Sequence, residues 1–361
     1  MTNSYIIPEE CRAAVVVDEG PDFTIKTQMV KVPTPGPDEV LIKLNATGIC
    51  YSDIHYMLND TGGRKMSASG ICSAGHEGSG VIVKLGENVT TFQIGDRAGV
   101  KPIFYTCGSC ELCWGGKESH CSKKILTGVG ATGTFQQYIV SPARYTTVIP
   151  KGIPDHVAAP AMCSAATAYR SVRESGLAVG SWATIIGGGG GVGIQAVQIA
   201  KAFGLRPIVV DSGNEKRDLA LKMGAEYFVD FKEFPDTSAE VIRLTGGIGS
   251  HGVFVTAPPA YPTAVNYIGA RIGGVIMCIG LPSAGSGHTI NVNPTMMILK
   301  SLSVKGTLVG TMQDTEAVLN LVERGLVREV CEVLPFERFP EAVDRLRKGQ
   351  VAGKLVIDYN A

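Results

Sequence analysis

The sequence predicts an α/β protein in which a doubly wound parallel sheet is inserted into a β-rich domain. The chain has 361 residues, more than one hydrophobic core usually organises, so two domains are expected. Residues 11–48 alternate as half-buried strands do, with prolines between the runs, and further strands are expected at 80–86 and 96–100. From about Pro160, short apolar strands alternate with helical periodicity, which is typical of a parallel sheet covered by helices.

The inserted domain is predicted to contain strands at residues 183–186, 207–211, 228–230, 252–255 and 274–280. A helix over residues 193–203 should end at Gly204, and a polar helix should end near Gly224. After about Lys305 the pattern becomes irregular, and one last strand is predicted at 354–358. We therefore expect a first domain made of residues 1–164 and 309–361, with residues 165–308 inserted between them.

Charge and hydropathy limit the possible partners. The 33 basic and 33 acidic residues cancel, so neither nucleic acid nor an anionic membrane has an electrostatic reason to bind. No apolar run reaches the length of a membrane span, and residues 1–12 lack a signal-peptide core. We therefore expect a cytoplasmic protein, whose ten cysteines are metal ligands or core residues rather than disulfides.

Four cysteines within 15 residues form a C-x2-C-x2-C-x7-C pattern: Cys107, Cys110, Cys113 and Cys121. Four thiolates so close together indicate a closed tetrahedral metal site, and structural zinc is the favoured ion. An iron–sulfur cluster also takes four cysteines, but the chain shows no partner for a redox role.

A glycine run follows the first strand of the inserted domain and opens a helix. It contains G-x-G-x-x-G as Gly188, Gly190 and Gly193. In this context backbone N–H groups and the helix dipole bind a pyrophosphate. Asp211 ends the next strand, 18 residues beyond Gly193, where a carboxylate would bind the adenosine ribose and repel a 2′-phosphate. The pattern favours NAD over NADP; a merely flexible turn is the weaker interpretation.

Cys50 and His76 are candidate ligands of a second, catalytic zinc. Such a site uses three protein ligands and leaves one position open. Cys163 lies where the β-rich texture changes to the alternating one, and it is the candidate for the third ligand. A free cysteine is more often a small buried apolar residue, which is what we expect of Cys11, Cys72, Cys278 and Cys331.

These motifs occur together and in order, and they resemble those of the zinc-dependent alcohol dehydrogenases of the medium-chain dehydrogenase/reductase superfamily. The resemblance extends over essentially the whole chain and is strongest to the microbial tetrameric branch. It rests on Cys50-Tyr51-Ser52-Asp53, on Gly75-His76-Glu77-Gly78, on the four-cysteine pattern, on Cys163 and on the glycine run. It implies a GroES-like catalytic domain, an inserted Rossmann domain, two zinc ions per chain, NAD, and a dimer or tetramer.

The resemblance also implies individual roles. Cys50, His76 and Cys163 would hold the catalytic zinc, and Asp53 would orient a ligating imidazole. Glu77 would stand near the metal and could enter its shell. Ser52 and His55 would form a proton relay that reaches solvent through the coenzyme ribose. The implied coenzyme contacts are Gly188, Gly190, Gly191, Val192, Gly193, Asp211, Lys216, Ile279 and Leu281.

Three residues depart from the family pattern. Tyr51 stands where the family usually has a basic residue on the pyrophosphate, and Lys354 replaces the usual Arg. We therefore expect both to contact the coenzyme, and to hold its pyrophosphate loosely. Met57 occupies a position that resembles a bulky Trp, which suggests a wider pocket than that of an ethanol specialist.

The function implied is hydride transfer between a small primary or secondary alcohol and NAD(H), with zinc acting as a Lewis acid. Three alternatives stay open at this point. They are a zinc enzyme of the same fold that reduces a conjugated carbonyl or catalyses a non-redox step, a dinucleotide-binding sensor or scaffold without turnover, and a zinc–thiolate redox sensor.

Overall fold

The structure is a computed structural model that describes residues 5–328 and 330–361. The chain forms two compact units. The first contains Met1–Ala166, Val309–Glu323 and Cys331–Ala361, and the second contains Thr167–Leu308 and Arg324–Val330. The first boundary lies two residues beyond the expected one, and the internal segment Arg324–Val330, expected in the first unit, belongs to the second.

The first unit is built on a seven-stranded sheet in the order β16-β17-β3-β4-β5-β9, with β8 beside β3. The strands are β3 (Glu39–Ile49), β4 (Glu77–Leu85), β5 (Arg97–Val100), β8 (Tyr138–Pro142), β9 (Thr147–Val148), β16 (Cys331–Pro335) and β17 (Lys354–Asp358). Both faces of β3 are covered, because Val40 and Ile42 pack in one apolar cluster and Leu41 in another. This explains why β3 reads as a nearly continuous apolar run.

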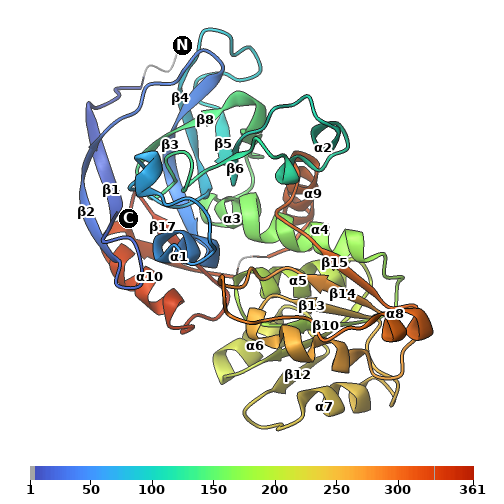
Figure 1. Ribbon diagram of the computed structural model, residues 1–361. Coiled ribbons are helices and arrows are strands. Elements are labelled where there is room, and N and C mark those ends of the chain that lie inside the picture. Colours follow the sequence, from blue (N-terminus) through green and yellow to red (C-terminus); the bar gives the residue numbers. More distant parts are fainter. Residues whose placement is uncertain (1–4, 329) are drawn as a thin grey trace. The chain divides into compact units, whose positions relative to one another are not determined.

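Smaller elements surround this sheet (Figure 1). The strands β1 (Glu10–Val17) and β2 (Thr24–Lys31) form a hairpin, and β6 (Ile103–Tyr105) pairs with β7 (Ile125–Leu126). The helices are α1 (Tyr51–Leu58), α2 (Glu111–Trp114) and α3 (Asp155–Pro160). A π-helix at Ala161–Ala165 leads into α4 (Ala166–Ser175), which belongs to the second unit except for its first residue.

The prediction that the chain is irregular after Lys305 was wrong. Helix α9 (Met312–Glu323) and helix α10 (Phe339–Arg347) lie in this part of the first unit. The start of α9 carries a capping signal, since the backbone N–H of Thr311 donates to Asp314 Oδ2 at 2.9 Å and the Asp314 N–H donates to Thr311 Oγ1 at 3.1 Å. This Thr-x-x-Asp pattern was available in the sequence and was missed.

The second unit contains a parallel six-stranded sheet in the order β12-β11-β10-β13-β14-β15. The strands are β10 (Trp182–Ile186), β11 (Arg206–Asp211), β12 (Tyr227–Asp230), β13 (Gly252–Val255), β14 (Val275–Cys278) and β15 (Ser303–Gly306). Numbered within the unit, this is the 3-2-1-4-5-6 order of a Rossmann fold, so the predicted fold class is confirmed. Its last strand, β15, was not predicted.

Helices α5 (Gly191–Ala202), α6 (Asn214–Lys222), α7 (Thr237–Leu244) and α8 (Pro294–Lys300) connect these strands, with a 3-10 segment at Pro258–Ile268 (Figure 1). Strand order reverses between β10 and β13, where ligands bind in open α/β sheets. Within the described residues, the structure contains no helix of the length and apolarity that a bilayer crossing requires.

Candidate metal and coenzyme sites

Helix α1 begins directly after Cys50, which occupies its N-cap with extended backbone angles (φ −105°, ψ 151°). Its backbone N–H donates to Asp53 Oδ2 at 2.9 Å, as in a capping box. The other oxygen of Asp53 lies 2.7 Å from His76 Nδ1. One fully buried carboxylate therefore fixes both Cys50 and His76, and it leaves Nε2 of His76 as the nitrogen that can face a metal.

Burial and a neighbouring charge shift the pKa of His76 in opposite directions. Desolvation lowers the pKa of its imidazole, but the adjacent Asp53 carboxylate outweighs burial and raises this pKa well above its ordinary value. Without a cation nearby, the imidazole therefore holds a proton more strongly than an ordinary histidine does. A metal ion at Nε2 competes with that proton, while Asp53 makes the neutral ring a stronger ligand.

Cys163 comes from a different element, the π-helix at Ala161–Ala165, which interrupts the run from α3 to α4. Such π segments occur often at functional sites, because they redirect one side chain from the helix surface. The ligand atoms of Cys50, His76, Glu77 and Cys163 all lie within 4.8 Å of one another, and all four residues are buried. The structure thus brings together the four residues predicted for the catalytic metal.

The two thiols of this cluster behave as a pair. The Cys163 side chain, hydrogen-bonded to Cys50, holds the pKa of Cys50 well below its ordinary value, and Lys354 and His76 add to the effect. The same hydrogen bond, together with burial, raises the pKa of Cys163. Cys50 therefore gives up its proton more readily than Cys163 does. A divalent cation that binds both sulfurs would displace the thiol protons that remain.

Glu77 is fully buried, and its Oε1 accepts a hydrogen bond of 2.8 Å from Lys354 Nζ. Burial raises the pKa of Glu77 to about 7, against the lowering effect of Lys354. Its Oε2 is one of the buried oxygens that lack a hydrogen-bond partner in the part of the chain that is described. A Cβ on Gly48 would lie 2.1 Å from this oxygen, so only glycine allows the carboxylate this position. The site therefore fits a cation.

Ser52, His55 and Tyr51 all lie on α1. His55 is buried, Ser52 is partly buried and Tyr51 is exposed. The rings of Tyr51 and His55 meet edge to face, with centroids 5.1 Å apart. The His55 ring also contacts Asp60, with Nδ1 2.6 Å from Oδ1, a pair that the sequence analysis did not find.

Tyr56 is a second residue near the cluster that sequence reasoning missed. Its ring centroid lies 6.1 Å from that of His76, at an interplanar angle of 61°. Burial, followed by the negative charges of Asp53 and the two cysteines, raises the pKa of its hydroxyl, which is therefore a neutral hydrogen-bond donor at ordinary pH. Met57, expected to border the pocket, is instead fully buried in the main apolar cluster of the first unit, so that expectation was wrong.

The four-cysteine lobe has the dimensions of a single-ion site. The Sγ–Sγ distances are 3.5 Å for Cys110–Cys113, 3.6 Å for Cys107–Cys121 and 3.9 Å for Cys107–Cys113. Two sulfurs bound at about 2.3 Å to one tetrahedral zinc lie about 3.8 Å apart. The four thiolates of an iron–sulfur cluster are distributed over two or four iron atoms, so thiolates on different irons lie farther apart than these. Hydrogen bonds from Ser109 lower the pKa of Cys107 to about 6, which favours a thiolate ligand.

In the second unit, the glycine loop joins β10 to α5 and lies at the reversal of strand order. Gly190 is the N-cap of α5, and a Cβ on Gly193 would lie 2.2 Å from the carbonyl oxygen of Gly187, so the loop and helix approach too closely for a side chain. The first N–H groups of α5, at Gly191, Val192 and Gly193, have no partner within the helix, which suits an anion.

Asp211 ends β11 beside this loop. Its Oδ2 accepts a hydrogen bond from the Gly189 N–H at 3.0 Å, and its Oδ1 lies 3.0 Å from Lys216 Nζ. The predicted pair therefore lies together next to the glycines. Ile279 and Leu281 follow β14, and the carbonyl oxygen of Gly280 between them accepts a 2.6 Å hydrogen bond from the Tyr261 hydroxyl. Tyr261 thus fixes this segment, and no motif in the sequence indicated it.

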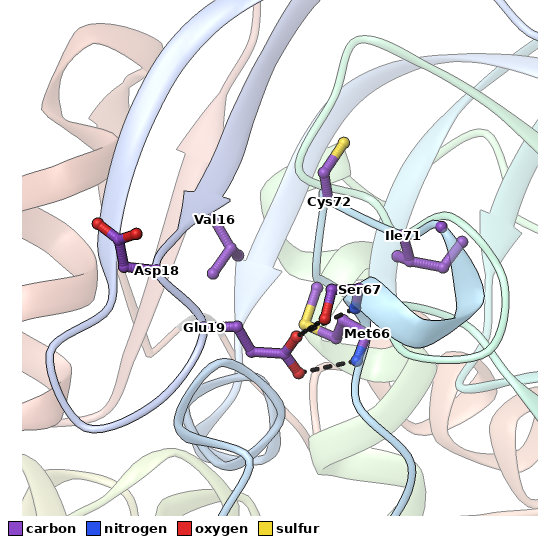
Figure 2. A pocket seen from close by; sticks show the side chains of 8 residues that line it. Val16, Asp18, Glu19, Met66, Ser67, Ile71 and Cys72 are labelled. Carbon is purple, nitrogen blue, oxygen red and sulfur yellow. Dashed lines mark hydrogen bonds between the residues drawn. The ribbon is translucent and has the colours of Figure 1, made fainter.

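A hollow of about 350 Å³ lies elsewhere on the first unit, between the end of β1 and the 3-10 turn at Ser67–Ser69 (Figure 2). The Glu19 carboxylate accepts hydrogen bonds there from the backbone N–H groups of Met66 and Ser67 and from Ser67 Oγ. Cys72 lines this hollow and is exposed, so the expectation that it is buried was wrong. None of the predicted site residues lies among its walls.

Comparison with known proteins shows to which family the chain belongs. Residues 36–151 match the model of the alcohol dehydrogenase GroES-like domain, and residues 191–324 match that of the zinc-binding dehydrogenases. The chain belongs to the zinc-dependent alcohol dehydrogenase family. It is 38% identical to an alcohol dehydrogenase of Schizosaccharomyces pombe, over 98% of this chain and 99% of that protein. This confirms the family indicated by the motifs.

Two further members of this family are similar over nearly their whole length. Alcohol dehydrogenase 1 of Neurospora crassa is 37% identical, over 98% of each chain. The crystal structure of an NAD-dependent alcohol dehydrogenase superposes with a TM-score of 0.85 at 28% identity, covering 96% of this chain and 99% of the other. These family members do not favour the alternative of a conjugated-carbonyl reductase or a non-redox enzyme.

Proposed function

We propose that the protein interconverts primary or secondary alcohols and the corresponding aldehydes or ketones, with NAD(H) as hydride acceptor and donor. The observation that carries this proposal is the buried cluster of Cys50, His76, Glu77 and Cys163, two of whose members are fixed by Asp53. Two thiolates and a neutral imidazole are the ligand set of a catalytic zinc with one position open to substrate.

In this proposal Cys50, His76 and Cys163 hold the zinc, and Glu77 stands beside it. The zinc, when bound, supplies Lewis-acid chemistry at the alcohol or carbonyl oxygen. Asp53 keeps in place the two ligands that directly precede α1 and β4, and the burial of all four residues excludes water from the site. Exclusion of water strengthens every electrostatic interaction there.

Ser52 and His55 carry the proton. Ser52 Oγ accepts the proton of the alcohol hydroxyl while its own hydroxyl proton moves on toward His55. His55 takes up this proton at Nε2 and releases it to solvent from the same nitrogen, because Nδ1 is engaged with Asp60. The two residues are three positions apart on α1, so they lie on the same side of the helix.

The second unit supplies the coenzyme site in this proposal. The N–H groups after Gly190 bind the pyrophosphate, while Asp211 and Lys216 bind the adenosine ribose. The Asp211 carboxylate disfavours NADP, and the matching NAD-dependent enzyme supports the same choice. Ile279 and Leu281 lie along the nicotinamide. In the first unit, Tyr51 and Lys354 are the residues proposed to contact the pyrophosphate.

The four-cysteine lobe holds a second zinc, which is structural, so the chain takes up two zinc ions in all. Its role is to fix a loop region that has only a four-residue helix of its own, α2. The Sγ–Sγ distances near 3.8 Å support one ion at this site.

We further infer that the protein is a cytoplasmic homo-oligomer, a tetramer or a dimer. Strand β15 is the edge of its parallel sheet, and the preceding helix α8 exposes Ile298 and Leu299, at 78% and 73%. An exposed sheet edge next to apolar side chains can pair with a second copy of the chain. Size-exclusion chromatography with light scattering tests this, and a monomer would contradict it.

The proposed activity is tested by following NADH formation with a panel of primary, secondary and allylic alcohols. Turnover should require metal-replete protein, should be lost on chelation and should return with zinc. If metal-replete protein formed no NADH with any alcohol and consumed none with the matching carbonyls, the proposal would be wrong.

A further inference from the structure

His55 and Asp60 form a pair at the C-terminal end of α1. Asn59 is the C-cap and adopts the left-handed conformation (φ 52°, ψ 41°), which turns the chain back toward the helix. The Asp60 N–H donates to the His55 carbonyl oxygen at 3.3 Å, and the Asp60 carboxylate reaches the ring of the same residue. The distance from His55 Nδ1 to Asp60 Oδ1 is 2.6 Å.

This contact is protected from water on the histidine side. The His55 side chain is 6% exposed and that of Asp60 is 25% exposed. A pair at such a distance and burial holds its geometry better than an exposed ion pair, which solvent screens. The Tyr51 ring, edge-on at 5.1 Å, limits the other side of the imidazole. Two residues therefore hold the ring of His55: Tyr51, on the same helix α1, and Asp60, in the turn that follows this helix.

The arrangement has a chemical consequence for proton transfer. With Nδ1–H directed at Asp60, the neutral ring is restricted to the tautomer that has its lone pair on Nε2. A histidine in this setting can accept a proton at Nε2 without first changing tautomer or turning.

We propose that Asp60 is a positioning residue for the proton relay, acting through His55 and not through substrate or coenzyme. This inference rests on the proposed function, because it assigns His55 the step that delivers the proton to solvent. It adds a third member, Asp60, to the pair Ser52 and His55. A purely structural role of Asp60 at the end of α1 is the competing explanation.

The two explanations are separated by a double-mutant cycle on the metal-replete enzyme. Asp60→Asn keeps the size of the side chain and removes the charge, His55→Gln removes the relay group, and the third protein carries both changes. The kcat/KM of the best alcohol at saturating NAD should fall about ten-fold in Asp60→Asn, which corresponds to the loss of one charge-assisted hydrogen bond. The double variant should be no slower than His55→Gln alone, because Asp60 then has no relay to position.

Four further measurements make the result specific. Asp60→Glu, which restores a carboxylate, should recover part of the rate lost in Asp60→Asn. NADH affinity and thermal stability should stay at the wild-type level in Asp60→Asn, and so should the rate of the control Asp22→Asn, which changes an exposed carboxylate of the first unit. Losses that multiply in the double variant, or a parallel loss of stability, would overturn the role of Asp60. Full activity of His55→Gln would instead show that His55 is not the relay.

Discussion

Lys354 Nζ donates a 2.8 Å hydrogen bond to Glu77 Oε1 inside the first unit, and the two side chains are only 3% and 0% exposed. Glu77 begins β4 and Lys354 begins β17, so the pair joins two strands that are separated by β3. Glu77 raises the pKa of Lys354 against the effect of burial. The ammonium that stands where the family usually has Arg is therefore bound to a carboxylate beside the proposed metal ligands.

Breaking this pair should destabilise the protein. Lys354→Met leaves the Glu77 carboxylate buried without its cation, and Glu77→Gln leaves the ammonium buried. Each change should lower the free energy of unfolding by about 3–5 kcal/mol. The double variant should lose clearly less than the sum, because neither charge is then left alone. Chemical denaturation of metal-replete protein measures this, with the exposed Lys348→Met as control; additive losses would contradict the coupling.

The two cysteine clusters should respond differently to substitution. Cys110→Ser removes a ligand of the structural site, so it should lower the melting temperature and reduce the zinc content. Structural zinc contributes folding energy directly. Cys163→Ser should leave a folded protein that still binds NADH but turns over at least a hundred-fold more slowly. Elemental analysis should find two zinc ions per wild-type chain; one ion, or iron, would refute the assignment.

Coenzyme choice should depend on the charge of Asp211. Asp211→Asn keeps an acceptor for the Gly189 N–H but removes the repulsion of a 2′-phosphate. The ratio of kcat/KM for NAD over NADP should fall about ten-fold or more in the variant. The exposed Asp218→Asn, on helix α6 of the same unit, serves as control and should not change the ratio. Equal efficiency with both coenzymes in the unmodified enzyme would contradict the preference.

Substitution of Tyr56 should change substrate preference, whereas substitution of its neighbour Met57 should change stability. Tyr56→Ala removes the ring beside His76, so branched and aromatic alcohols should gain about ten-fold relative to ethanol. Met57→Ala opens a cavity in the core and should cost about 2–5 kcal/mol of stability with little change in substrate preference. If substrate preference changed in Met57→Ala and not in Tyr56→Ala, Met57 would border the substrate pocket, as the sequence had indicated.

Lys101 links stability to pH. It is 2% exposed, and burial lowers the pKa of its amine to about 8. Because this folded-state pKa lies below the unfolded value of 10.5, carrying the charge costs stability below pH 8, and the cost disappears as pH rises toward 10.5. Lys101→Met should therefore stabilise the protein at pH 7 by about 2 kcal/mol. The difference in stability between Lys101→Met and the unmodified protein should be smaller at pH 9.5 than at pH 7, as measured by thermal unfolding. The control Lys84→Met, which changes an exposed lysine, should show no such pH dependence.

The features that could be predicted from the sequence are those formed by residues close together in the chain. The capping position of Cys50 and its link to Asp53 lie within one helical turn, and the glycine loop lies within one strand–helix junction, so the sequence contains the whole arrangement. Pairs that join distant segments could not be found in this way. Lys354 and Glu77 are 277 positions apart, and only the sheet order brings them together.

Other misses had local causes. Tyr56 and Met57 are adjacent, and the burial of each depends on the rotation of α1, which spacing alone predicts only to within about a residue. Strand β15 has an exposed, polar sequence, so it lacks the apolar signal of the inner strands. Cys163 was found as a candidate ligand, but the π-helix that presents it has no signature in the sequence.

The strand that supplies Lys354 is synthesised after the whole second unit, although its neighbour β3 is synthesised before that unit. β17 inserts between β16 and β3, and its residue Leu355 pairs with Ile49, the neighbour of Cys50. The second unit can fold while synthesis continues, since most of it is one uninterrupted segment, Thr167–Leu308. The first unit cannot close its sheet until β17, which is made after the whole second unit, has left the ribosome. A nascent chain can therefore complete the unit that contains the glycine loop before it encloses the buried cluster of Cys50, His76, Glu77 and Cys163.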